Sequence, residues 1–333
     1  MTSTKKEFTL RDVVKDLLER PDARKDHELE VRFRTTSKQK LSKIDFDNII
    51  RKLKSMKFMT TNPSGDYQLK IQGEYTDVKS GRTKMSNLRT QINGLSGIQT
   101  YCKENSLSTI EYTTNYMMKT YAKVGNETVF PINNDDLQFR VSYQKEAILT
   151  NKSPAVRQML GEWANTKKNF RFINRVTFIH PSYPVRVDLS VVKSSVNQRQ
   201  YNIQESGVFG ANETYEVEIE VVNDNISYGE SVEGLEKKIK SMIKVVLSGL
   251  QNTNYPIGVK QQTEVKNSYM KLLHGREKDL LHPRDFCGPA SYTLELKNIQ
   301  PLSEETVSPN IRNNYTVTDK ADGVRKLMYI DSE

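Results

Sequence analysis

The sequence predicts a β-dominated α+β protein: a closed eight-stranded sheet, or small β-barrel, with flanking helices. About eight segments alternate apolar and polar residues with the period of two that is typical of half-buried strands. The polar faces of these strands carry many charged side chains, and four other segments have apolar stripes at helical spacing. Eight strands can close a small barrel, and the helices can cover its apolar outer face. The interior of the barrel is therefore expected to be charged.

Four helices are expected from an apolar stripe together with a boundary signal. Their expected limits are 9–19, Asp45 to about Met56, Ser153 to Trp163, and Ser231 to about Leu250. Thr9 and Asp45 are the candidate N-caps of the first two helices. The strands are expected near residues 27–34, 67–72, 86–92, 115–121, 137–146, 169–178, 184–192 and 214–222. In the fifth strand, for example, Val141 and Tyr143 alternate with Arg140 and Ser142.

Two of the expected strands carry rows of acids. These are HELEVRF, with Glu28 and Glu30, and TYEVEIEVV, with Glu216, Glu218 and Glu220. Successive side chains of a strand point to opposite faces, so each row projects from one face. Two carboxylates about 4 Å apart repel by roughly 4 kcal/mol at an effective dielectric near 20. Such an array either lies in water, as a solvated sheet face, or holds cations.

Composition sets further limits. With 333 residues the chain can form one large domain and part of a second. It has no apolar run of the roughly 20 residues that cross a bilayer, so we expect a soluble protein in a cytosol-like compartment. Cys102 and Cys287 have no zinc-like spacing. The net charge of +9 favours a polyanionic partner.

The composition of the sequence changes after about Gln251, where turn-forming residues become frequent. We expect a first domain over residues 1–260, and a linker with the start of another domain over 261–333. In the first domain, a charged interior with Glu on some strands and Arg and Lys on others suits a multiply charged phosphate chain with a divalent metal. Magnesium or manganese is the expected cofactor, because both prefer carboxylate oxygens.

The motifs ELEVRF (28–33), RVDLSVVK (186–193) and EVEIE (216–220) resemble the metal-dependent RNA triphosphatases of the triphosphate tunnel family, over roughly residues 8–260. The resemblance implies an eight-stranded antiparallel barrel around a hydrophilic tunnel. It places Glu28, Glu30 and Glu220 at metal-ligand positions, with Glu216 and Glu218 beside them, and it gives Glu146 the role of orienting the attacking water. The implied phosphate-binding residues are Arg89, Lys119, Arg140, Arg175, Arg186 and Lys193, and further substrate contacts are expected from Arg32, Arg171 and Asp188. One departure is Ile173, at a position where relatives often carry a basic residue; Arg171 is a candidate substitute.

Near the C-terminus, TDKADG (318–323) looks like the KxDG motif of covalent nucleotidyltransferases. Following a tunnel-type triphosphatase, it resembles the guanylyltransferase of mRNA capping enzymes from large DNA viruses such as giant viruses and poxviruses. The resemblance implies that Lys320 is the GMP-accepting nucleophile. Later guanylyltransferase motifs are missing, so this chain is expected to be an N-terminal fragment whose guanylyltransferase is inactive. GTP is therefore an expected ligand only of the full-length enzyme.

The expected activity is that of an RNA 5′-triphosphatase, which removes the γ-phosphate of nascent mRNA as the first step of capping. The expected partner is RNA with a 5′-triphosphate, and the expected location is the cytoplasm of an infected cell, in a viral factory or virion. Two alternatives stay open. One is hydrolysis of free nucleoside triphosphates or polyphosphate, and the other is a non-catalytic RNA-binding module whose acidic strands face solvent.

Overall fold

The computed structural model describes residues 7–20, 22–34, 40–77, 80–277, 280–288, 293–304, 308–316, 319 and 326–330. The chain divides into two compact units, Met1–Val259 and Lys260–Glu333. Among the described residues, every strand and most of the helices lie in the first unit.

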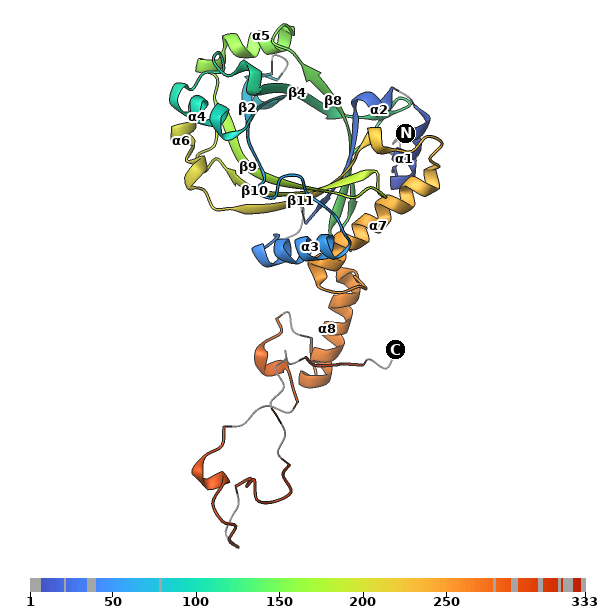
Figure 1. The fold of residues 1–333 in the computed structure, drawn as a ribbon, viewed down its shortest axis with the longest axis vertical. Coiled ribbons are helices and arrows are strands. Elements are labelled where there is room, and N and C mark those ends of the chain that lie inside the picture. Colours follow the sequence, from blue (N-terminus) through green and yellow to red (C-terminus); the bar gives the residue numbers. More distant parts are fainter. Residues whose placement is uncertain are drawn as a thin grey trace. The chain divides into compact units, whose positions relative to one another are not determined.

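A closed antiparallel barrel forms the centre of the first unit (Figure 1). Its eight strands, all predicted from the sequence, are β1 (His27–Phe33), β2 (Asp66–Thr76), β3 (Thr83–Asn93), β4 (Thr114–Tyr121), β8 (Phe139–Leu149), β9 (Lys168–Ile179), β10 (Val185–Ser194) and β11 (Thr214–Val221). The hydrogen-bonded order is β1-β11-β10-β9-β2-β3-β4-β8, and pairing of β8 with β1 closes the ring. Three short strands were not predicted: β7 (Ile132–Asn134) pairs with β8, and β5 (Lys123–Val124) pairs with β6 (Glu127–Thr128).

The helices cover the outside of the barrel. The three that pack over β1, β8, β10 and β11 are α1 (Leu10–Glu19), α3 (Lys43–Ser55) and α7 (Val232–Gln251). The remaining helices of this unit are α2 (Ala23–Asp26), α4 (Leu95–Glu104), α5 (Pro154–Gly161) and α6 (Ile203–Ser206), and there are 3₁₀ turns at Glu111–Thr113, Trp163–Asn165, Val208–Gly210 and Asn223–Asn225. All four expected helices are present, whereas α2, α4 and α6 were not predicted.

One predicted cap was wrong. Thr9 caps α1 as expected, but the N-cap of α3 is Ser42 rather than Asp45. Asp45 is the third helical residue, and its carboxylate accepts hydrogen bonds from the backbone N–H and the hydroxyl of Ser42. This reciprocal arrangement is a capping box, which satisfies two donors at the start of the helix.

Two apolar cores lie between the barrel and the helices. One joins α1, α3 and α7 to β1, β8, β10 and β11, and the other joins α4 and α5 to β2, β3, β4 and β9. Leu29, Val31 and Phe33 of β1 are all buried in the first core. Because side chains alternate along a strand, Glu28, Glu30 and Arg32 point to the other face, into the barrel. The outer side of the sheet is therefore apolar and its inner side charged, as the alternation predicted.

Close approach of α3 and α7 depends on Gly249. A Cβ atom at this position would lie 2.8 Å from the Cα atom of Ile49, so Gly249→Ala forces the two helices apart. We expect Gly249→Ala to lower the free energy of unfolding by about 1–3 kcal/mol, as overpacking generally does. Gly161→Ala is the matched control, because nothing lies within 4 Å of a Cβ atom there. Urea denaturation measures both; equal stabilities of the two variants would contradict this account of the helix contact.

Nearly all of α8 (Val259–His274) belongs to the second unit, where the sequence was interpreted as a linker. Its other described elements are 3₁₀ turns at Pro283–Asp285 and Leu296–Asn298. His274 lies 2.9 Å from the carboxylate of Asp285, and the ring of Tyr269 packs edge-on against Tyr329. Lys320 of the KxDG motif lies outside the described residues.

Candidate active site in a charged tunnel

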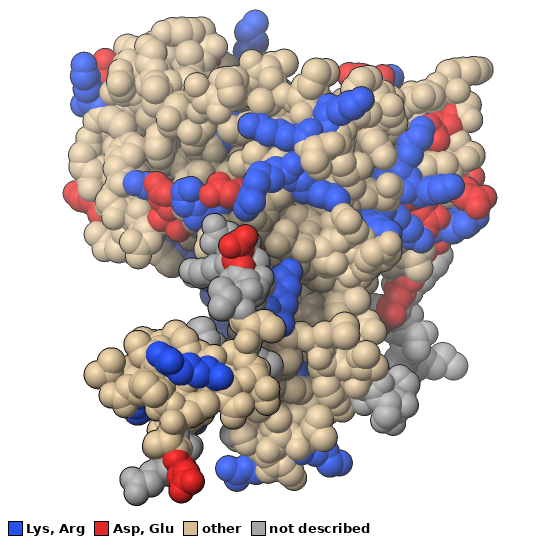
Figure 2. Space-filling model, turned by 60° about the horizontal axis from the view of Figure 1, so that its bottom comes forward, with Lys and Arg blue, Asp and Glu red and all other residues tan. Residues whose placement is uncertain are grey.

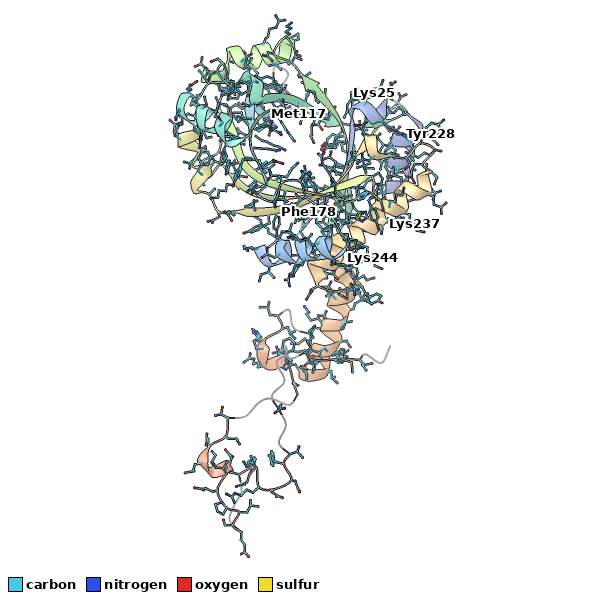
Figure 3. All side chains as sticks on the ribbon, viewed as in Figure 1. Lys25, Met117, Phe178, Tyr228, Lys237 and Lys244 are labelled. Atoms are coloured by element: carbon cyan, nitrogen blue, oxygen red, sulfur yellow. The ribbon has the colours of Figure 1, made fainter. Side chains whose placement is uncertain are left out.

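The inward faces of the eight strands line a tunnel through the barrel, and side chains project into the opening from its wall (Figure 3). Its acids come mainly from β1, β10 and β11, and its unpaired cations from β2 and β3. Outward-facing residues have the opposite character: Phe178 of β9, for example, is buried in the core beneath α3. The same alternation that builds the cores therefore concentrates charge in the tunnel.

Glu28, Glu30 and Glu220 form the acidic centre of the tunnel. Glu30 lies directly opposite Glu220 in the pairing of β1 with β11, and only 3% of its surface is exposed. Burial and the neighbouring Glu28 raise the pKa of Glu220 to about 8. Burial also raises the pKa of Glu30, and Glu28 and Glu218 add to this rise. The excess of carboxylates is thus incompletely neutralised by the protein, and a bound cation would relieve it.

Cations of the tunnel are paired with these acids. Lys119 of β4 bonds the Glu28 carboxylate and lies 3.7 Å from Glu146. Arg186 donates to Glu220 at 2.7 Å. Arg32 approaches Glu30 at 3.1 Å and Glu218 at 2.9 Å. The carboxylates that could bind a metal are therefore held by lysine and arginine, and within the described ranges no three acid, histidine or cysteine side chains converge as a ready-made ligand set.

Arg175 links two of the most deeply buried acids. It donates to Asp188 and to Glu218, both at 3.1 Å, and the Asp188 side chain is only 1% exposed. Thr177 also donates to Asp188, at 2.6 Å. Burial acts to raise the pKa of Glu218, but Arg32 and Arg175 outweigh it and hold that pKa below its usual value. Both acids of this group are therefore paired with arginine, and the group is an ion-pair network rather than an open site for a metal.

Glu146 of β8 is a half-buried acid at the edge of the acidic centre. Burial raises its pKa, with Lys119 opposing and Glu28 adding to the rise. It shares Lys119 with Glu28, so it lies beside the acidic centre. One end of the tunnel here borders a cavity of about 840 Å³ whose lining includes Glu28, Glu146, Arg186 and Glu220. A substrate entering from this end would meet the acidic centre and Glu146 together.

Among the predicted site residues that lie away from this centre are Lys193, Glu216 and Arg140. Lys193 follows Val191 on the outward face of β10, where its ammonium donates to the carbonyl of Phe209. Glu216 pairs with Arg171 at 2.6 Å, four residues and so roughly 13 Å along the strand from Glu220. Arg140 lies opposite Arg32 and donates to Asn133; six residues, or roughly 20 Å, separate it from Glu146. Lys193 therefore cannot be a tunnel residue, and Glu216 lies apart from the candidate metal ligands.

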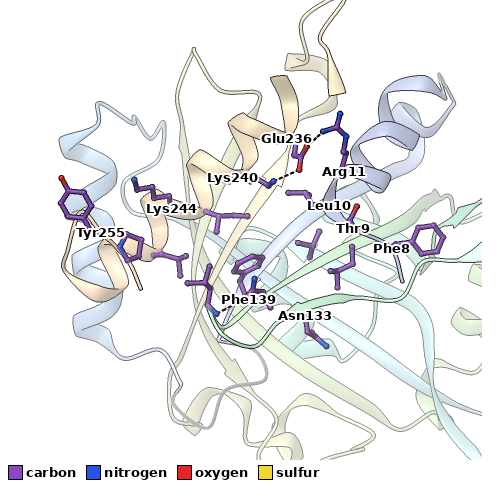
Figure 4. Close-up of a pocket in the computed structure, with 17 residues that line it drawn as sticks. Phe8, Thr9, Leu10, Arg11, Asn133, Phe139, Glu236, Lys240, Lys244 and Tyr255 are labelled. Carbon is purple, nitrogen blue, oxygen red and sulfur yellow. Dashed lines mark hydrogen bonds and ion pairs between the residues drawn. The ribbon is translucent and has the colours of Figure 1, made fainter. Parts of the chain in front are cut away.

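A second large cavity, of about 860 Å³, lies on the outside of the barrel (Figure 4). Its lining is mostly apolar and comes from the start of α1, from β7 and β8, and from α7. Its one acid, Glu236, is paired with Lys240 at 2.7 Å and with Arg11 at 3.7 Å. The cavity offers apolar contact surface but no arrangement suited to phosphate chemistry, so the tunnel is the candidate active site.

Comparisons with known proteins find likenesses of structure. No protein-family model matches the sequence, and no curated protein matches it. The triphosphatase of the Mimivirus capping enzyme is 15% identical, with a TM-score of 0.42, covering 72% of this chain and 92% of that chain. The S. pombe RNA triphosphatase Pct1 is 11% identical, with a TM-score of 0.37, covering 75% of this chain and 96% of that chain. A chain from the structure of the S. pombe Mediator head module is 12% identical, with a TM-score of 0.36, covering 67% of this chain and 94% of that chain.

Sequence reasoning overlooked one charged tunnel residue, Lys70 of β2. It lies opposite Arg171 and Gln91 on the neighbouring strands. The signal was present in YQLKIQ, where Lys70 stands between Leu69 and Ile71, two fully buried residues of the second core. Across the described residues, we find no helix with the length and apolar character that crossing a bilayer requires.

Proposed function

We propose that the chain is a metal-dependent RNA 5′-triphosphatase that removes the γ-phosphate of an RNA 5′ end, the first step of mRNA capping. The observation that carries this proposal is the tunnel itself, in which buried carboxylates with raised pKa values face lysine and arginine side chains. Phosphoryl transfer needs metal, cationic groups and an oriented water, and little covalent help from the protein. The sequence motifs in β1 and β11 support the same activity.

Different residues would supply the metal ligands and the cationic groups. Glu28, Glu30 and Glu220 would hold Mg²⁺ or Mn²⁺, because all three offer hard oxygen donors and two have raised pKa values. When bound, the metal would polarise the phosphoryl oxygens and neutralise charge that develops on them. Lys119 and Arg186 lie next to these acids and would contact the phosphate oxygens.

Glu146 would orient the attacking water and accept its proton. The water oxygen then bonds to the γ-phosphorus while the bond from this phosphorus to the β–γ bridging oxygen breaks. The products are inorganic phosphate and an RNA with a 5′-diphosphate. The bridging oxygen leaves as part of the diphosphate, whose charge the nearby cations balance.

RNA is the proposed substrate because the chain carries a net charge of +9, and lysine and arginine side chains form a band across the face shown in Figure 2. Free nucleoside triphosphates and polyphosphate are the alternative substrates, since the same acids and cations could act on any linear phosphate chain. The origin in a large DNA virus, the location in an infected cell and the guanylyltransferase role of Lys320 rest on the sequence motifs alone.

The experiment that tests the proposal compares phosphate release from triphosphate-ended RNA, ATP and tripolyphosphate, each with Mg²⁺, Mn²⁺ and EDTA. We expect release from RNA to have the highest kcat/KM and to require a divalent ion. Preference for ATP or tripolyphosphate would favour the alternative hydrolase. RNA binding without any metal-stimulated release would favour the non-catalytic module.

Glu146→Gln tests the role of the proposed base. The amide cannot accept a proton, so kcat should fall by roughly 100-fold or more, whereas KM should change little because the effect arises in the transition state. Steady-state kinetics with triphosphate-ended RNA give both constants. An unchanged kcat with a raised KM would show instead that Glu146 only binds substrate.

A further inference from the structure

An apolar side chain is exposed on the inner face of the barrel, where the tunnel ends. Ile148 of β8 is 80% exposed. It lies two residues after Glu146, and its neighbour Leu149 packs against the second core on the outer face. Because side chains alternate along a strand, Ile148 points inward, and it lies opposite Met117 of β4. The phosphate groups of a substrate have no use for an apolar contact, so Ile148 suits another part of that substrate.

Ile148 lines the cavity of about 840 Å³ that borders this end of the tunnel. The candidate active site contributes to the same lining through Glu28, Glu146, Arg186 and Glu220. Further lining residues come from α2 and from the turn after β11, among them Arg24 and Asn223. Ligand cavities of proteins measure roughly 300–1,000 Å³. This cavity therefore has room for a nucleoside beside the phosphate groups.

Asn223 and Arg24 each have a buried polar atom that lacks a partner. The side-chain amide of Asn223 donates to the backbone carbonyls of Arg24 and His27, at 3.0 and 2.9 Å, and these two bonds fix its orientation. Among the described residues, no donor reaches Oδ1 of Asn223 and no acceptor reaches Nε of Arg24. Buried polar atoms are nearly always hydrogen-bonded. The wall of this cavity thus retains one acceptor and one donor for a ligand.

The order of these groups along β8 matches the order of groups in a nucleotide 5′-triphosphate. Two residues of a strand span roughly 7 Å, so Ile148 lies about that far beyond Glu146, next to the end of the strand at Leu149. When the γ-phosphate lies near Glu146, the β- and α-phosphates separate it from the nucleoside. The nucleoside then reaches the end of the tunnel. Its base is apolar on both faces and polar at the edges, so it can contact Ile148 while polar atoms meet the cavity wall.

We propose that this cavity binds the first nucleoside of the RNA, with the face of the base on Ile148 and polar groups of the nucleoside toward Asn223 and Arg24. The ligand class is a nucleoside that carries a 5′-triphosphate. Contact with the face of a base is independent of base identity, so the subsite accepts all four bases. This inference rests on the proposed function, and it adds residues that select a nucleotide end over a bare phosphate chain.

The test is titration calorimetry in EDTA, which needs neither metal nor hydrolysis. It compares ATP with methyl triphosphate, which carries the same charge but has no nucleoside. Wild type should bind ATP roughly 5-fold more tightly or better, because the base covers apolar surface of Ile148. Ile148→Ala should lose most of this preference while binding methyl triphosphate as wild type does. Ile44→Ala, at a 71% exposed position of α3, is the matched control and should keep the preference.

Ile148→Phe adds a readout that a structural role would not change. An aromatic ring stacks on a base better than isoleucine does, so this variant should bind ATP roughly 3-fold more tightly than wild type, with methyl triphosphate unaffected. Three results would each overturn the inference: no ATP preference in wild type, an unchanged preference in Ile148→Ala, or no gain in Ile148→Phe.

The same variants distinguish this inference from the proposed function. A protein that prefers ATP through Ile148 but shows no metal-stimulated phosphate release would contradict only the proposed hydrolase function. Metal-stimulated release from triphosphate-ended RNA without this preference would overturn only the nucleoside subsite.

Discussion

Replacing Glu30 with glutamine is expected to lower kcat/KM for metal-stimulated phosphate release by roughly 100-fold or more while leaving the fold intact. Glu30 is buried opposite Glu220, and burial together with neighbouring acids raises its pKa. The substitution removes a proposed metal ligand, but it also relieves repulsion within the acidic centre. The melting temperature should therefore not fall, in contrast to most substitutions of buried residues.

The control for this variant is Glu162→Gln, at an exposed position after α5. It should match wild type in activity and in stability. Titration calorimetry with Mn²⁺ distinguishes weaker metal binding from a slower hydrolytic step. Glu30→Gln should bind the ion more weakly than wild type. Normal turnover of Glu30→Gln at saturating Mn²⁺ would contradict the placement of the metal at this centre.

Arg175→Met should be among the most destabilising substitutions in the tunnel. Its guanidinium contacts Asp188 and Glu218, whose side chains are 1% and 8% exposed. Removing one partner of a buried ion pair typically costs 3–5 kcal/mol. Because Arg186 still contacts Asp188 and Arg32 still contacts Glu218, we expect a loss of about 3 kcal/mol in the free energy of unfolding at pH 7.5, measured in urea.

This loss should depend on pH. In wild type, arginine neighbours hold the pKa of Glu218 below its usual value, so the stability from this residue is present at neutral pH and is lost as pH falls. Without Arg175 the effect of burial dominates, and the pKa of Glu218 rises. The variant is then penalised as pH rises through that new value, so its deficit should be smaller at pH 5 than at pH 7.5. An equal deficit at both values would contradict this mechanism, and Arg157→Met on the exposed face of α5 is the control.

The barrel was predictable because each strand has one apolar and one charged face, and these faces also fixed which side of β1 and β11 lines the tunnel. Helices α4 and α8 were not predicted, because their sequences carry weaker helix signals. The N-cap of helix α4 is Gly94, which offers no side-chain hydrogen bond, and the helix is only ten residues long. Helix α8 is largely polar, and Met270 is its one described residue that is buried.

The candidate site was only partly predictable, because ion pairs between strands distant in sequence decide which charges are free. Arg171 was a candidate substitute for the cation missing at Ile173, yet it is paired with Glu216. The alternation of RVDLSVVK already sets Lys193 on the face of Val191, and a motif comparison alone overlooked this. The register of β2 against β9, which brings Lys70 opposite Arg171, requires the three-dimensional structure.

The most direct measurement of the central claim uses RNA labelled separately at the β- and γ-phosphates of its 5′ end. With Mg²⁺ or Mn²⁺, the protein should release the γ-label as inorganic phosphate and leave the β-label on the RNA, and both EDTA and Glu30→Gln should prevent release. Retention of both labels in the presence of metal, release of the β-label, or full release in EDTA would contradict the assignment of the charged tunnel as a metal-dependent RNA triphosphatase.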